Sequence, residues 1–115
     1  MRGTNEKDMY PRVRRNLRRR YPKSKGWEII EQPDYGGYKP DFIVERKKGK
    51  KTEKIVVEVK ATDKISKEHI EQLNDYAKKL AGKDVKIVAK EFYVLAGTDA
   101  SEAKKQGFSV HYLRM

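Results

Sequence analysis

Apolar residues recur every three or four positions in two segments of the chain, which is the spacing of an amphipathic helix. The first predicted helix runs from about Met9 to Arg20. We expect Asp8 to be its N-cap, because Pro11 then falls in the first turn, where the N–H that proline lacks would have no helical partner. If the helix begins earlier, Pro11 lies in its interior and kinks it. The predicted buried face consists of Tyr10, Val13 and Leu17.

The second predicted helix has the clearer pattern. Ser66 is its expected N-cap, Ile65 and Ile70 occupy the two positions of a hydrophobic staple, and Gly82 marks its end. His69 is expected to face solvent. The predicted buried face consists of Ile70, Leu73, Ala77 and Leu80.

The remaining apolar segments alternate with polar residues or run continuously, which predicts strands. A basic turn at residues 48–51 joins two of them in an expected hairpin. Residues 85–96 form either one long strand or two short ones, and a short helix capped by Thr98 or Asp99 ends at Gly107. The other predicted strands are Trp27–Glu31, Asp41–Lys47, Glu53–Ala61 and Phe108–Leu113.

The predicted order of elements is helix, three strands, helix, strand, helix, strand. This order favours an α/β domain in which helices cover both faces of a mixed sheet. The chain has 115 residues and no repeat, linker or break in composition. We therefore expect a single domain over residues 1–115.

The chain is strongly basic. It contains 28 Lys plus Arg and 17 Asp plus Glu, which gives a formal charge of +11 and an isoelectric point near 9.8. This imbalance favours a polyanionic partner, with nucleic acid as the first candidate and an anionic membrane surface as the second. No apolar run approaches the roughly 20 residues that span a bilayer, and the N-terminus lacks the apolar centre of a signal peptide. We therefore expect a cytoplasmic protein without a membrane segment.

The chain has no cysteine and only two histidines, His69 and His111. This composition excludes disulfides, thiolate zinc sites, a cysteine nucleophile and an all-histidine metal site. A bound metal would need mainly oxygen ligands, which suits hard cations such as Mg²⁺ or Mn²⁺.

One predicted central strand carries charges on one of its faces. Glu58 and Lys60 lie on that face, while Val57 and Val59 lie on the other. A hairpin turn at residues 48–51 would pair residue 47 with residue 52, and the same register brings Asp41 opposite Glu58. Another aspartate, Asp34, also follows a proline, but the glycines after it indicate a turn, so Asp41 is the better candidate.

Two neighbouring carboxylates repel each other unless positive charge lies between them. Lys60 supplies one positive group, and a divalent cation would supply the rest. The reaction that uses such a group is metal-assisted phosphodiester hydrolysis, in which the cation polarises the phosphoryl oxygen and the lysine orients the attacking water or offsets developing charge. The pattern therefore predicts Asp41 and Glu58 as metal ligands and Lys60 as the catalytic lysine.

The segments Pro40-Asp41 and Glu58-Val59-Lys60 resemble the motif of the PD-(D/E)XK nuclease superfamily, which has the restriction-endonuclease-like fold. The order of predicted elements is similar as well, over roughly residues 6–96. The resemblance implies a deoxyribonuclease that uses Mg²⁺ or Mn²⁺. It also implies that the carbonyl of Val59 is a further metal ligand.

Two more segments extend the resemblance. Gln72 and Tyr76 look like the Gln-x-x-x-Tyr motif of the RecB-like branch, and their i, i+4 spacing places them on one side of a helix. The resemblance implies that both reach the active site. Glu6 is similar to the acidic residue in the first helix of some small family members, where it would join the metal; Asp8 is the alternative.

Basic and aromatic residues outside these motifs predict a DNA-binding surface. Arginine binds phosphate oxygens through a paired fork, and tyrosines beside Gly36 and Gly37 would stack on a splayed base. Lysines in the hairpin turn would contact the DNA backbone or protect the sheet edge from aggregation. The predicted nucleic-acid-binding residues are Arg12, Arg15, Arg19, Tyr35, Tyr38 and Lys48.

The sequence thus predicts a small metal-dependent nuclease that acts on DNA. The main alternative is a non-catalytic nucleic-acid-binding protein that uses the same basic surface. The resemblance also implies a homodimer, because small relatives often pair to cut two strands.

Overall fold

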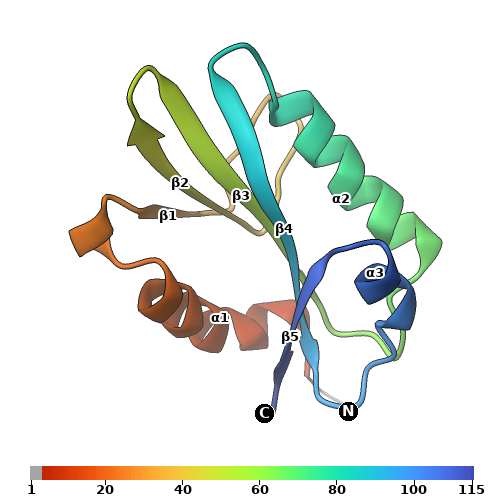
Figure 1. Cartoon of the computed structure of the whole chain (residues 1–115). Helices are drawn as coiled ribbons and strands as arrows, with labels where there is room; N and C mark the ends of the chain where they lie inside the picture. Colours follow the sequence, from red (N-terminus) through yellow and green to blue (C-terminus); the bar gives the residue numbers. More distant parts are fainter. Residues whose placement is uncertain (1–3) are drawn as a thin grey trace.

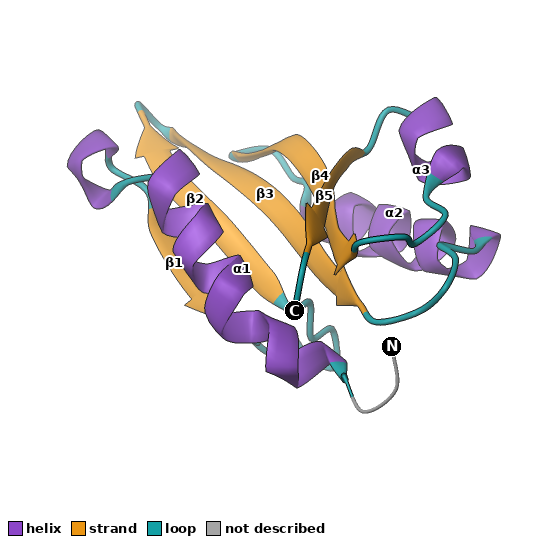
Figure 2. Ribbon diagram, turned by 90° about the horizontal axis from the view of Figure 1, so that it is seen from below, coloured by secondary structure: helices purple, strands orange, loops and turns teal. Residues whose placement is uncertain are grey.

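A five-stranded sheet forms the centre of the computed structural model, which describes residues 4–115 (Figure 1). The elements are α1 (Glu6–Arg20), a 3₁₀ turn (Lys23–Lys25), β1 (Glu28–Glu31), β2 (Phe42–Lys48), β3 (Lys51–Lys60), α2 (Lys67–Leu80), β4 (Val85–Leu95), α3 (Ser101–Lys105) and β5 (Ser109–Leu113). Helix α1 covers one face of the sheet, and α2 and α3 cover the other (Figure 2). The predicted α/β fold and order of elements are confirmed.

Helix α1 begins earlier than the sequence pattern predicted. Its N-cap is Asn5, whose side chain accepts a hydrogen bond from the Asp8 N–H, while the Asp8 carboxylate accepts one from the Asn5 N–H. This reciprocal capping box satisfies two otherwise free donors, and the prediction of Asp8 as the N-cap is wrong. Pro11 consequently lies inside the helix. The buried face contains the three predicted residues and one more: Met9, Tyr10, Val13 and Leu17.

The sheet is mixed, with the strand order β1-β2-β3-β4-β5. The first three strands are antiparallel, and β3, β4 and β5 run parallel. The hairpin turn is tighter than predicted, because only Gly49 and Lys50 lie outside the strands, and Gly49 has the positive φ of 67° that such a turn needs. The predicted pairing of Lys47 with Thr52 is nevertheless confirmed.

Strand β4 is one continuous strand with a bulge. Lys54 of β3 pairs with Ile87, but the next residue, Ile55, pairs with Ala89, so Val88 is an extra residue. A bulge shifts the alternation of side chains between the two faces of a strand. This shift explains why the periodicity of residues 85–96 does not distinguish one strand from two.

Helix α2 begins at the predicted N-cap, but His69 has a different role from the one expected. The Nδ1 atom of His69 accepts a hydrogen bond from the Ser66 N–H at 3.1 Å, and the Ser66 hydroxyl accepts one from the His69 N–H at 3.3 Å. His69 is therefore half-buried in a capping box, and the prediction that it faces solvent is wrong.

Helix α3 is capped differently from the prediction. Its N-cap is Ala100 rather than Thr98 or Asp99. The Asp99 carboxylate still accepts hydrogen bonds from the N–H and the hydroxyl of Ser101, at 3.0 and 2.7 Å. The Thr98 hydroxyl instead donates to the carbonyl of Thr62, which ties the loop after β4 to the loop after β3.

Two apolar clusters fill the space on the two sides of the sheet. The cluster under α2 and α3 includes Ile43, Val56, Leu73, Phe92 and Phe108. The cluster under α1 includes Val13, Phe42, Val57, Val59 and Tyr93. Within residues 4–115, no helix combines the length and the apolar character needed to cross a bilayer.

A buried ion pair fastens the C-terminal end of α1 to β4. Glu91 is 1% exposed, and Arg20 donates to both of its carboxylate oxygens, at 2.7 and 2.8 Å. The Tyr21 hydroxyl donates to the same carboxylate at 2.6 Å, and His111 Nε2 lies 3.1 Å from it. Burial acts to raise the pKa of Glu91, but the hydrogen bonds from His111, Arg20 and Tyr21 outweigh it and lower this pKa to about 2.

Candidate active site

Asp41 and Glu58 lie side by side where β2 begins and β3 approaches its end. The last pair of the β2–β3 ladder is Phe42 with Val57, and the next positions are Asp41 and Glu58. The Asp41 N–H donates a hydrogen bond to Glu58 Oε2 at 2.8 Å, so the carboxylate continues the ladder by one step. Glu58 is 4% exposed.

Glu58 and Lys60 of β3 face α2. Val57 and Val59 belong to the apolar cluster under α1, whereas Val56 belongs to the cluster under α2. Because side chains alternate along a strand, Glu58 and Lys60 point to the same side as Val56. The predicted division of β3 into a charged and an apolar face is thereby confirmed.

Two groups from different elements hold the Asp41 carboxylate. The Tyr10 hydroxyl of α1 donates a hydrogen bond to Asp41 Oδ1. The backbone N–H of Val59 donates to Asp41 Oδ2 at 2.7 Å. Sequence reasoning identified Tyr10 only as a core residue, because the pattern shows that its ring is buried but not where its hydroxyl points.

Burial and mutual repulsion favour the protonated forms of both carboxyl groups. Burial, followed by the charge of Asp41, raises the pKa of Glu58 to about 8. Burial also raises the pKa of Asp41, although its hydrogen bonds from Tyr10 and Val59 act in the opposite direction. The positive charge of Lys60 lowers both pKa values, yet Lys60 forms no ion pair with any residue of the described chain.

We expect the substitution Glu58→Gln to stabilise the metal-free protein at alkaline pH. The folded state raises the pKa of Glu58 above its ordinary value of 4.5, so the stability that Glu58 contributes is complete below pH 4.5 and is lost as the pH rises through about 8. Glutamine keeps the acceptor for the Asp41 N–H but carries no charge. Urea unfolding with a chelator should show a gain of about 2 kcal/mol at pH 8 and almost none at pH 4. Equal effects at the two pH values would contradict this assignment.

Glu6, rather than Asp8, lies near these carboxylates. The Ala61 N–H, at the end of β3, donates to Glu6 Oε2 at 3.4 Å, and the charge of Glu6 acts to raise the pKa values of Asp41 and Glu58. Asp8 is occupied in the capping box of α1. The choice between the two predicted acids therefore favours Glu6.

The carboxylates at this site supply some, but not all, of the oxygen ligands that a hard cation needs. Asp41 and Glu58 supply neighbouring carboxylates, and within residues 4–115 no group donates a hydrogen bond to Glu58 Oε1. The described residues contain no group of three or more His, Cys, Asp or Glu side chains close enough to hold an ion. A cation at this position would thus have two adjacent carboxylates as its main side-chain ligands, with Glu6 farther away.

Tyr76 and Gln72 lie at the edge of the site on α2. Burial raises the pKa of Tyr76, and the charges of Glu58 and Asp41 raise it further, which shows that the phenol lies within the field of the carboxylates. Gln72 is exposed and donates to the Tyr76 hydroxyl at 3.3 Å. The structure therefore brings Tyr76 toward the pair, while Gln72 contacts Tyr76 rather than the carboxylates.

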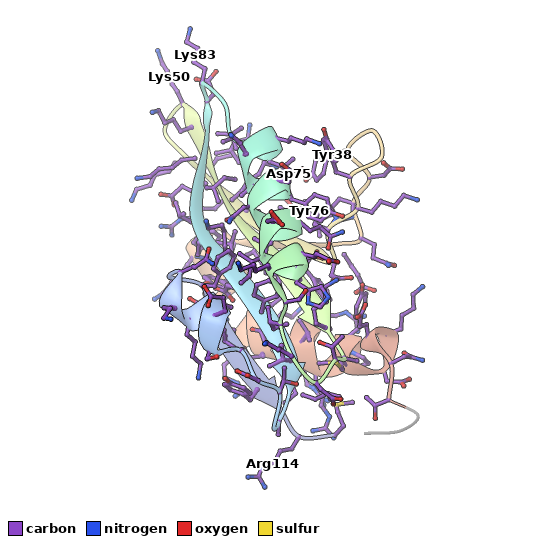
Figure 3. The ribbon with its side chains drawn as sticks, turned by 90° about the vertical axis from the view of Figure 1, so that its right-hand side faces the viewer. Tyr38, Lys50, Asp75, Tyr76, Lys83 and Arg114 are labelled. Carbon is purple, nitrogen blue, oxygen red and sulfur yellow. The ribbon has the colours of Figure 1, made fainter. Side chains whose placement is uncertain are left out.

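The predicted DNA-binding tyrosines have separate surroundings. Tyr38 lies beside Tyr76, with ring centroids 6.1 Å apart, and Lys79 Nζ is 4.3 Å from the centroid of the Tyr38 ring (Figure 3). Tyr35 packs against the apolar cluster under α2, with Lys54 Nζ 5.3 Å from its ring. Of the two tyrosines, Tyr38 is therefore the one whose ring lies against Tyr76 of α2.

Lys48 lies far from the acidic pair. It ends β2, whereas Asp41 precedes this strand, and seven steps of about 3.3 Å separate the two backbones by roughly 23 Å. Arg12, Arg15 and Arg19 are exposed on α1, on the other side of the sheet from α2. Lys48 and the three arginines thus do not form one cluster with the acidic pair.

Comparison with known proteins agrees with this arrangement. A family model described as the PD-(D/E)XK nuclease superfamily matches residues 30–89, a segment that runs from β1 to β4 and carries Asp41, Glu58 and Lys60. No curated protein matches the chain. The matched segment is more than half of the 115 residues and includes the paired carboxylates and the lysine. The chain therefore belongs to the PD-(D/E)XK nuclease superfamily.

Proposed function

We propose that this protein is a deoxyribonuclease that requires Mg²⁺ or Mn²⁺. The observation that carries the proposal is the pair of Asp41 and Glu58, two largely buried carboxyl groups joined by the hydrogen bond from the Asp41 N–H to Glu58, whose repulsion Lys60 opposes. Such a pair is costly to a metal-free protein and suits a site that a divalent cation completes. Membership of a nuclease superfamily supports the same reading.

In this proposal Asp41 and Glu58 are the principal metal ligands, and the Val59 carbonyl and Glu6 complete the set. When bound, the cation would polarise a phosphoryl oxygen and lower the pKa of water. Tyr10 and the Val59 N–H would keep the Asp41 carboxylate oriented, since each holds one of its oxygens. Lys60, on the same face of β3, would hold the attacking water or offset the negative charge that develops on the phosphate.

We further propose that Gln72 and Tyr76 act as the Gln-x-x-x-Tyr pair of the RecB-like branch. Their contact on one side of α2 and the position of Tyr76 in the field of the carboxylates support this role. Gln72 would then orient the Tyr76 phenol toward the substrate. A homodimer and a cytoplasmic location stay predictions of the sequence.

The test is cleavage of labelled linear, circular, flap and four-way DNA in the presence of Mn²⁺ or Mg²⁺. We expect cleavage of at least one substrate that stops when a chelator is added, and cutting of the circle would identify an endonuclease. DNA that is bound but left uncut with either ion would contradict the proposal and favour the non-catalytic binding protein. The variant Asp41→Asn is expected to lose the dependence on metal together with the activity.

A further inference from the structure

Three arginines form a row on the side of α1 that faces β5. Arg12, Arg15 and Arg19 follow one another at i, i+3 and i+7, and all three are exposed. Together with Asn16 and Leu113 they line one shallow depression of about 440 Å³. We call Arg12, Arg15 and Arg19 the α1 arginine row.

The arginine row lacks the carboxylate partners that two arginines of the same helix, Arg14 and Arg20, have. Arg14 pairs with Glu31 at 2.6 Å, and Arg20 pairs with Glu91 at 2.7 Å. Among residues 4–115, no Asp or Glu lies within ion-pair distance of the arginine row. Like charges spaced three or four residues apart on a helix repel each other, so the row is the kind of surface that an external anion would stabilise.

The side-chain amide of Asn16 is a neutral hydrogen-bond donor of defined orientation in the same depression. The Tyr93 hydroxyl accepts a hydrogen bond from Arg20 at 2.9 Å and donates one to Asn16 Oδ1. This donation fixes the carboxamide oxygen of Asn16 toward the sheet and leaves its NH₂ group free to donate to a ligand. Because Glu91 holds Arg20, the buried network of β4 determines the orientation of Asn16.

The arginine row lies on a different side of α1 from the candidate site. Glu6, at the start of α1, contacts the end of β3. With a rise of about 1.5 Å per residue, Arg12 lies about 9 Å and Arg19 about 20 Å farther along the helix axis. Each residue also advances about 100° around the axis, so the three arginines lie about 120° to 180° around the helix from Glu6.

We propose that the α1 arginine row, with Asn16, binds the backbone phosphates of a DNA duplex outside the immediate surroundings of the scissile bond. The inference rests on the proposed function only for DNA as the substrate. Arginine forks and an amide donor contact phosphate oxygens without reading bases, so this surface positions the substrate and does not select its sequence.

The binding test uses a fluorescently labelled duplex in a chelator, so that no cleavage occurs. The variant R12Q/R15Q/R19Q is compared with wild type and with K83Q/K86Q/K105Q, which removes the same charge at exposed lysines that are not among the predicted DNA contacts. Lys83 lies at the opposite end of the molecule from Arg114, the neighbour of Leu113 in β5 (Figure 3), and Lys105 belongs to α3, on the other face of the sheet from α1. Thermal unfolding first confirms that all three proteins are equally folded.

We expect the arginine variant to lose at least about tenfold in affinity, and the slope of log affinity against log salt to fall by about 2 to 3, because about three phosphate contacts disappear. The lysine variant should lose less than about threefold, since distant charges are screened. Equal losses in the two variants, or no loss in the arginine variant, would overturn the proposal. Asn16→Ala should cost about threefold, and unchanged affinity would contradict the role of Asn16.

Two further measurements separate the alternatives. On linear duplexes, wild type should cut bonds with eight flanking base pairs at least about tenfold faster than bonds with two, whereas the arginine variant should cut both at similar rates; length preference retained by the variant would overturn the assignment of the flanking contacts to the arginine row. Vesicles containing phosphatidylserine test an anionic membrane, and binding to vesicles but not to DNA would also overturn the proposal. If no ion supports cleavage, the proposed function fails, while the chelator experiment still decides whether the arginine row binds DNA.

Discussion

The substitution Lys60→Ala is expected to reduce DNA cleavage by about 10²- to 10³-fold or more, while the fold and the affinity for DNA stay nearly unchanged. Lys60 points to the same side of β3 as Glu58 but pairs with no carboxylate in the described part of the chain. Its removal therefore breaks no ion pair of the folded protein. In the proposed function, the variant loses a positive charge beside the phosphate on which negative charge would accumulate during hydrolysis.

Single-turnover cleavage of labelled DNA with saturating enzyme and Mn²⁺ measures this effect apart from binding. The matched control is Lys64→Ala, which removes an exposed lysine from the loop that follows β3 and should leave the rate within about twofold of wild type. Lys60→Arg tests whether charge alone suffices. A Lys60→Ala variant that cleaves as fast as the Lys64 control would refute the catalytic assignment.

The substitution Arg20→Met is expected to destabilise the protein by about 3 to 5 kcal/mol. Methionine leaves the Glu91 carboxylate 1% exposed and without its cation, and the cost of such an uncompensated charge exceeds what the pair itself contributes. The comparison is Arg14→Met, because the side chains of Arg14 and Glu31 are each 37% exposed. That surface pair should contribute no more than about 1 kcal/mol.

The pH dependence provides an independent check of the Glu91 pair. The folded pKa of Glu91, about 2, lies below its ordinary value of 4.5, so its stabilising contribution is present above pH 4.5 and is lost as the pH falls toward about 2. Urea unfolding between pH 3 and pH 6 should therefore show a steeper fall for wild type than for Arg20→Met. The double variant Arg20→Met/Glu91→Met should recover most of the lost stability, and no recovery would contradict the explanation by an unpaired charge.

The central part of the candidate site is predictable from sequence because it depends on the register of one hairpin and on the alternation of side chains along a strand. Once residue 47 pairs with residue 52, an antiparallel ladder requires Asp41 to face Glu58, and alternation requires Glu58 and Lys60 to share a face. Helix α2 can be predicted equally well, since its cap and its buried face follow from local spacing. These features depend on residues that are near one another in the chain or on a single register.

The remaining features depend on contacts between distant segments. Glu91 and Arg20 are 71 positions apart, and a lone glutamate in an apolar strand gives no sign of its partner. The hydrogen bond from Tyr10 to Asp41 similarly joins α1 to the start of β2, although the helical pattern of Tyr10 indicates only burial. The start of α1 differs from the prediction for a local reason, because the two hydrogen bonds of the Asn5 capping box outweigh the preference of proline for a first turn.

The tight turn at Gly49 has a consequence for how the chain tolerates changes in length. Exposed loops usually accept insertions at little cost. In this hairpin, however, a one-residue slip would put Asp41 opposite a valine and invert the faces of a whole strand. Changes in the length of this surface turn are therefore restricted by the need to keep Asp41 beside Glu58 at the other end of the hairpin.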